Sequence, residues 1–163
     1  VVRDQDFRVR NVTSEIGAGD YSVVHIATHG QFDSDHTKSF LLAYDDKLTM
    51  DGLQQTIATR RYGDEPLEFL VLSACQTAAG DDAAALGLAG VALRAGARSA
   101  LATLWFISDA STSQLIAQFY EELKDPANSK ARALQNAQVK LMDDPRYRHP
   151  SYWAPFLLIG NWL

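Results

Sequence analysis

The sequence predicts an α/β protein in three layers, with a mostly parallel sheet and helices on both faces. Strand-length runs of β-branched and apolar residues alternate with helix-length amphipathic segments, and this alternation is typical of a parallel sheet covered on both sides. The strand runs are apolar almost throughout, as in strands buried on both faces. With 163 residues, of which 47% are hydrophobic, the chain is long enough to form one substantial core.

The first half of the chain predicts two strands, a hairpin and a short helix. Residues 21–28 are β-branched and apolar and lie between glycines, which indicates an interior strand. After a polar loop, residues 41–49 have the pattern of a small hairpin. Thr49 is expected to cap a short helix, and a second buried strand is expected at residues 67–73.

The second half predicts three helices and two further strands. A helix of small residues at 83–95 is expected to end at Gly96, because glycine favours the turn that follows a helix. Strands are predicted at 99–104 and 152–160. Helices are predicted to begin at Ser108, with Leu115, Ile116, Phe119 and Leu123 facing inward, and at Ser129, with a stripe of Ala133, Leu134, Ala137 and Leu141.

Charge and composition restrict the function. The 20 acidic residues outnumber the 15 basic ones, and the basic residues are scattered, so we expect no direct binding of nucleic acid or of an anionic membrane. No apolar run reaches the roughly 18–20 residues of a membrane span. A single cysteine excludes an internal disulfide and a multi-cysteine zinc site, and it fits a reducing, cytoplasmic compartment.

Cys75 and His29 are the predicted catalytic pair. Cys75 lies at the end of one buried strand, and His29 lies at the end of another strand 46 residues upstream. The carboxyl ends of neighbouring parallel strands meet at the edge of the sheet where ligands bind. A thiol and an imidazole placed there make a nucleophile and its base. Gly30, directly after His29, and the small-residue loop after Cys75 supply backbone N–H groups that are expected to stabilise an oxyanion.

Other chemistries are poorly supported by the sequence. His25 and His29 have the spacing of a helical metal-binding pair, but in a strand their rings would be roughly 13 Å apart. His25 is therefore expected to be a packed strand residue, and His36 and His149 to be exposed in loops. No Gly-x-Ser-x-Gly motif indicates a serine nucleophile. We predict no metal and no cofactor.

The ordered motifs resemble the CHAT domain family, within the caspase-like superfamily of cysteine peptidases. The short caspase signature around the nucleophilic cysteine is met only in part, because Ser73 and Thr77 differ from it. The similarity runs from Tyr21 to the end of the chain. The matching segments are His25-Ile26-Ala27-Thr28-His29-Gly30, Val71-Leu72-Ser73-Ala74-Cys75-Gln76-Thr77, Gly87-Leu88-Ala89-Gly90, Ala95-Gly96-Ala97, Leu104-Trp105-Phe106-Ile107-Ser108-Asp109 and Trp153-Ala154-Pro155-Phe156-Leu157-Leu158-Ile159-Gly160.

The resemblance implies a three-layer caspase-like fold with a His29–Cys75 dyad that hydrolyses a peptide bond in a protein substrate. It also implies a bacterial protein in which helical repeats, or a partner protein, regulate this domain. Residues 1–20 form a short, polar segment that lacks an initiator Met. We expect them to be the remnant of an N-terminal subdomain or a linker, and residues 21–163 to form the protease domain. Activity of this fragment by itself is left open.

Three further residues are candidates for binding substrate. Asp33 follows His29, and Asp109 and Trp105 follow the third strand. A carboxylate there would pair with an arginine or lysine before the cut bond. The competing interpretations are a turn residue for Asp33, a first-turn helix acid for Asp109 and a core aromatic for Trp105. For the whole domain, the alternatives are a non-catalytic caspase-like interaction module and a thiol hydrolase or transferase that acts on a non-peptide acyl group.

Overall fold

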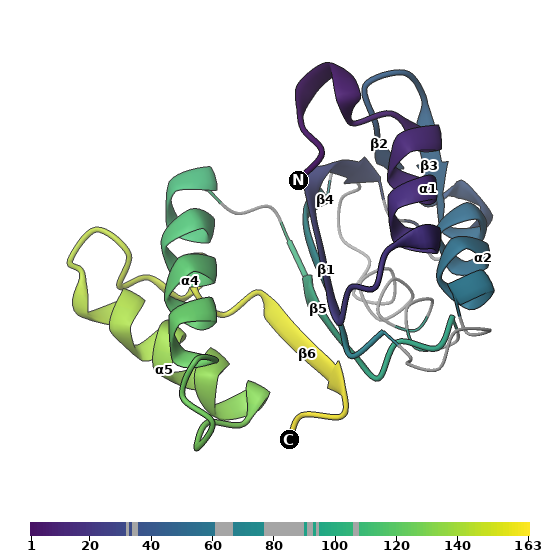
Figure 1. The fold of residues 1–163 in the computed structure, drawn as a ribbon. Coiled ribbons are helices and arrows are strands. Elements are labelled where there is room, and N and C mark those ends of the chain that lie inside the picture. The colour runs from purple at the N-terminus through teal and green to yellow at the C-terminus, as the bar shows by residue number, and fades with distance from the viewer. Residues whose placement is uncertain are drawn as a thin grey trace.

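The computed structural model describes residues 1–31, 33, 36–60, 67–76, 90, 93, 95–105 and 108–163. These residues form one six-stranded sheet flanked by helices (Figure 1). The strands, in spatial order, are β3 (Lys47–Thr49), β2 (Phe40–Leu42), β1 (Val23–Gln31), β4 (Phe69–Gln76), β5 (Ser99–Thr103) and β6 (Phe156–Gly160). The described helices are α1 (Val9–Ala18), α2 (Met50–Arg60), α4 (Asp109–Glu122) and α5 (Lys130–Asp143), with 3-10 turns at Asp4–Asp6, His36–Lys38 and Pro150–Tyr152.

The prediction of an α/β protein is confirmed, but the prediction of a mostly parallel sheet is wrong. Strands β1, β4 and β5 are parallel neighbours, whereas the other three of the five neighbouring pairs are antiparallel. The β2–β3 pair is a local hairpin, which is antiparallel by construction. Two helices, α4 and α5, separate β5 from β6. The second helix reverses the chain once more, so β6 runs against β5.

The core lies on both faces of the sheet. On one face, α1 and α2 pack against the sheet through buried residues that include Val12, Ile16 and Leu53. On the other face, α4 and α5 bury Phe119 and Leu141 together with side chains of the central strands. Neighbouring positions of β4 alternate between the two clusters, as the period of two in a strand requires. The central strands are therefore held from both sides.

Local sequence signals correctly predicted three helix starts and a glycine turn at Gly96. The Thr49 hydroxyl accepts the N–H of Gly52 at 3.1 Å at the start of α2, and the Ser129 hydroxyl accepts the N–H of Arg132 at 3.2 Å at the start of α5. Ser108 directly precedes α4. Gly96 has a φ of 104°, a left-handed conformation that favours glycine. The predicted helix at 83–95 otherwise falls largely outside the described residues.

Three strands have other boundaries in the structure than the sequence predicted. Strand β1 continues through His29 to Gln31, because its last two residues also pair with β2. Strand β4 likewise continues to Gln76. The last strand begins at Phe156 rather than at residue 152, because Pro155 precedes it and proline has no N–H to donate to a ladder. None of the described helices is long and apolar enough to span a membrane.

Candidate active site

The predicted nucleophile and base are paired positions on neighbouring strands. In the parallel ladder between β1 and β4, His29 pairs with Cys75 and Gly30 pairs with Gln76. Neighbouring strands lie about 4.8 Å apart, so the two backbones are adjacent at this point. The side chain of His29 is exposed, whereas that of Cys75 is outside the described part of the molecule. The sequence predicted both residues at the ends of their strands, and the structure places His29 two residues before the end of β1 and Cys75 one residue before the end of β4.

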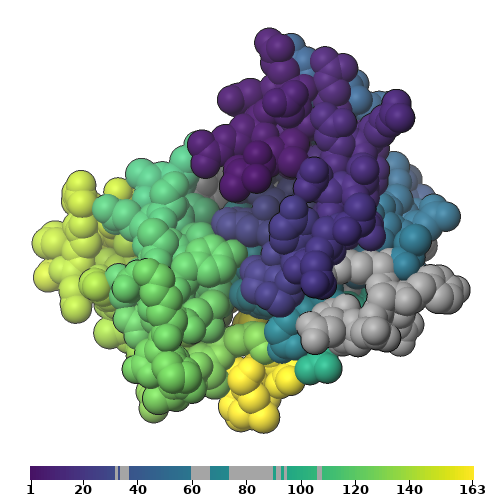
Figure 2. All heavy atoms as spheres, viewed as in Figure 1, coloured from purple at the N-terminus to yellow at the C-terminus, as the bar shows by residue number. Residues whose placement is uncertain are grey.

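One face of β1 is open to solvent although β1 is an interior strand. Every second residue from Val23 to His29 is exposed, while Ile26 and Gly30 are buried. Helices α4 and α5 lie on the side of β5 and β6 (Figure 1), and atoms of β1 reach the surface beside α4 (Figure 2). His29 is therefore accessible to a solvent-borne substrate.

Gly30 is held between two strands. It pairs with Gln76 of β4 and with Leu41 of β2, and it is buried. Its backbone is therefore fixed by ladders on both sides, next to the predicted base. Rigid placement of a backbone group is what an oxyanion donor needs, and the role predicted for Gly30 stays a prediction.

A second histidine lies on the same strand, in contact with β4 and α4. The Nε2 atom of His25 is 3.0 Å from the Ser73 hydroxyl, and the His25 ring lies 5.8 Å from the ring of Tyr120 in α4. Although His25 belongs to the open face of β1, burial of its ring lowers its pKa from the ordinary value of 6.5. His25 therefore contacts β4 and α4, as expected of a packed strand residue, but it remains exposed. His149 is exposed, as expected, and the side chain of His36 falls outside the described residues.

Comparison with known protein families identifies the chain. The model of the CHAT domain matches residues 1–161. The chain belongs to the CHAT domain family. This family is part of the caspase-like peptidase superfamily, in agreement with the resemblance noted in the sequence. The match includes the first 20 residues, and the division of this CHAT domain at residue 20 stays a prediction.

A curated relative shares part of this CHAT domain. Human "Tetratricopeptide repeat protein 28" is 36% identical to it over 69 residues, which is 42% of this chain and 3% of that protein. The chain therefore corresponds to a very small part of that relative. The name of this relative refers to a class of helical repeats, which is the kind of region that the resemblance implies beside a CHAT domain.

The three candidate substrate-binding residues occupy different surroundings in this CHAT domain. The backbone of Asp33 exchanges hydrogen bonds with the buried Ser39 hydroxyl, at 2.9 and 3.2 Å. Asp109 is the exposed first residue of α4, where a negative charge favours the helix. Trp105 is 40% exposed, and its indole N–H donates to the carbonyl of Ser151 at 3.3 Å. Trp105 is thus not a core residue, and substrate binding by all three remains a prediction.

Within the described ranges, no group of three His, Cys, Asp or Glu residues is arranged to hold a metal ion.

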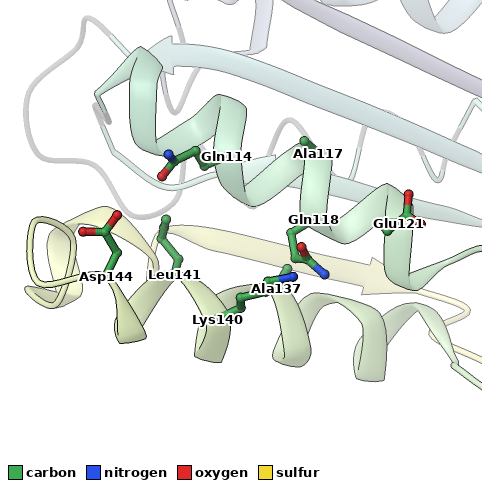
Figure 3. A pocket seen from close by; sticks show the side chains of 8 residues that line it. All are labelled: Gln114, Ala117, Gln118, Glu121, Ala137, Lys140, Leu141 and Asp144. Carbon is green, nitrogen blue, oxygen red and sulfur yellow. The ribbon is translucent and has the colours of Figure 1, made fainter.

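The helical layer contains a groove of about 470 Å³ between α4 and α5, lined by Gln114, Gln118 and Lys140 among others (Figure 3). Its lining residues include none of the predicted site residues. This groove is therefore separate from the strand positions of His29 and Cys75.

Sequence reasoning does not single out Ser73 or Tyr120 as functional residues. In the sequence, Ser73 is only part of a strand and of the family motif, and Tyr120 belongs to no motif. A usable signal is nevertheless present: Ser73 precedes Cys75 by two residues and His25 precedes His29 by four. Even spacing along strands places residues on a common face, so a serine and a histidine can be expected near the predicted pair.

Proposed function

We propose that this CHAT domain is a cysteine endopeptidase in which Cys75 is the nucleophile and His29 is the general base. The pairing of His29 with Cys75 across the β1–β4 ladder carries this proposal. Membership of a caspase-like family supports it. The exposure of His29 supports it further, because a substrate must reach the base.

The reaction follows from the chemistry of these two groups. His29 takes the proton of the Cys75 thiol, and the thiolate attacks the carbonyl carbon of the peptide bond. Backbone N–H groups near Gly30 and Cys75 stabilise the oxyanion that forms. The carbon–nitrogen bond then breaks, and the proton on His29 passes to the leaving amine. Water, activated by the same histidine, hydrolyses the thioester and releases the second product and the free thiol.

We further propose a preference for arginine or lysine before the cut bond, through Asp33 or Asp109. A carboxylate in a partly desolvated pocket pairs well with a guanidinium group. A peptide library varied at that position, cleaved by the parent and by Asp33→Asn and Asp109→Asn, tests this. Loss of the basic preference in one variant is expected, and a preference for acidic or apolar residues in all three proteins would contradict it.

We propose that helical repeats, in the same polypeptide or in a partner, regulate a protease domain at residues 21–163. The name of the tetratricopeptide repeat relative supports this context. We place the protein in the cytoplasm of a bacterium on the resemblance and on the single thiol. Peptide cleavage measured with and without the repeat-containing polypeptide tests the regulation, and equal rates would contradict it.

Covalent labelling tests the nucleophile and the base together. Cys75 is the only cysteine, so a peptidyl electrophile that reacts with a thiol reports on it alone. We expect one adduct on the folded protein, and labelling slower by a factor of about 100 in His29→Ala, the size of a general-base contribution. His149→Ala is the matched control, because His149 is an exposed histidine on another element. Labelling only after unfolding would instead favour a non-catalytic interaction module.

A further inference from the structure

The hydrogen bond between His25 and Ser73 links the two strands that carry the predicted dyad. It joins the imidazole Nε2 of His25 in β1 to the hydroxyl of Ser73 in β4, at 3.0 Å. In the ladder His25 pairs with Val71, and Ser73 pairs with Ala27, so this side-chain bond crosses the ladder diagonally. It lies just before the paired positions of His29 and Cys75.

The His25 ring is also held from the helical layer. Its centroid lies 5.8 Å from that of Tyr120, and Tyr120 lies 5.6 Å from Phe119 in the same helix. Phe119 lies 5.7 Å from Phe69 at the start of β4. The contacts therefore form a closed circuit from β4 through α4 to β1 and back to β4 at Ser73. Such tilted aromatic pairs each stabilise a packed arrangement by about 0.5–1.5 kcal/mol.

A polar pair at this place has a cost that an apolar pair would avoid. His25 lies on the open face of β1 and Ser73 is half-buried, so the imidazole and the hydroxyl are only partly removed from water, and even this partial removal is unfavourable unless they bond to one another. What the polar pair adds is a fixed geometry between the two side chains. A hydrogen bond fixes the distance and orientation of two groups, and it rigidifies the strands that carry them.

We propose that His25 and Ser73 are positioning residues, whose hydrogen bond keeps β1 and β4 aligned so that His29 and Cys75 stay opposed. This inference rests on the proposed function, because it assigns the pair to the alignment of that dyad. The competing explanation is that the pair only contributes to packing. The positioning role predicts that Cys75 becomes less reactive when the hydrogen bond is removed and the fold is kept. The packing explanation predicts that the reactivity of Cys75 does not change.

The test is the pH dependence of Cys75 alkylation by iodoacetamide in the full chain, measured for Ser73→Ala, Ser73→Thr and His29→Ala. We expect Ser73→Ala to react about threefold to tenfold more slowly near pH 7, the equivalent of one hydrogen bond. Its apparent thiol pKa should rise toward the ordinary value of about 8.5. Ser73→Thr keeps the hydroxyl and should react within about twofold of the parent.

The molecule offers a matched control in a second serine–histidine bond. The Ser151 hydroxyl lies 2.8 Å from Nδ1 of His149, in the 3-10 turn before β6, so Ser151→Ala removes the same kind of bond away from the β1–β4 ladder. This variant is expected to react like the parent. If Ser73→Ala does not fold, His25→Phe replaces it, since phenylalanine keeps a ring beside Tyr120 but cannot bond to Ser73. It is expected to slow alkylation as much as Ser73→Ala.

Three outcomes would overturn the inference, and they are distinguishable. If His29→Ala slows alkylation but Ser73→Ala and His25→Phe match the parent, the dyad stands and the positioning role is wrong. If His29→Ala also matches the parent, the proposed function fails and the positioning role fails with it. A slow Ser73→Ala whose rate Ser73→Thr does not restore would show that the hydrogen bond is not responsible.

Discussion

Replacing Gly160 with alanine is expected to destabilise the edge of the sheet strongly. Gly160 is the last residue of β6 and pairs with Ser99. Its φ is +93°, a conformation that side-chain-bearing residues rarely adopt. A Cβ atom added there would lie 2.4 Å from the carbonyl oxygen of Arg98 and 2.8 Å from Cδ2 of Leu93. The first contact is with backbone, so the strand itself has to move.

The size of the effect follows from two contributions. A left-handed backbone conformation costs an alanine about 1–2 kcal/mol. Moving the end of β6 away from Arg98 also loosens the hydrogen bond from the Asn161 N–H to the Arg98 carbonyl, at 2.8 Å, and a hydrogen bond is worth about 1 kcal/mol net. We therefore expect Gly160→Ala to lower the free energy of unfolding by about 2–3 kcal/mol.

Equilibrium urea unfolding measures this change, and Gly17→Ala is its control. Gly17 lies in α1, and a Cβ atom there would meet nothing within 4 Å. Because alanine is the better helix former by about 1 kcal/mol, Gly17→Ala should raise the free energy of unfolding by up to that amount. Opposite signs for the two variants are the expected result. A Gly160→Ala protein within about 0.5 kcal/mol of the parent would refute the reasoning, because strained positions cost more than that.

Three further predictions concern single side chains. Burial lowers the pKa of His25 below its ordinary value of 6.5, so His25 contributes to stability while it is neutral, above that value, and this contribution is lost as the pH falls below it. Urea midpoints measured from about pH 7.5 to 5 should therefore fall more steeply in the parent than in His25→Gln. Parallel curves would contradict this. The Tyr120 hydroxyl is buried without a hydrogen-bond partner among the described residues, so Tyr120→Phe should raise the free energy of unfolding by about 1 kcal/mol; a loss of that size would mean that the hydroxyl is bonded. The Lys130 ammonium, on a side chain only 12% exposed, donates to Glu68 at 2.8 Å and to the Leu163 carbonyl at 3.0 Å. Lys130→Met should therefore lower the free energy of unfolding by about 1–3 kcal/mol. An unchanged urea midpoint would show that these hydrogen bonds add nothing to stability.

Elements with strong local signals were predictable from the sequence. The helix from Ser129 has a capping serine and four small or apolar residues at helical spacing, and all four are buried in α5. The cap at Thr49 was equally readable, because the hydroxyl bonds to a backbone N–H three residues ahead. Local hydrogen bonding and period determine such features, so no knowledge of distant segments is needed.

Features that depend on distant segments were not predictable in the same way. Strand β1 extends through His29 because Gly30 and Gln31 pair with Leu41 and Phe40, and nothing near His29 in the sequence shows that pairing. The direction of β6 depends on how α4 and α5 pack on each other. The bond between His25 and Ser73 joins residues 48 positions apart. The neighbourhood of the two chemically interesting residues was predicted, whereas the contacts around them required the structure.

Peptide cleavage by the parent, Cys75→Ala, His29→Ala and the double variant tests the central claim most directly. Residues that act as one unit have strongly non-additive effects on catalysis. Each single variant is expected to lower the rate of cleavage by a factor of about 1,000 or more, and the double variant is expected to be no worse than either. Full cleavage by Cys75→Ala would contradict this, because the nucleophile would then lie elsewhere.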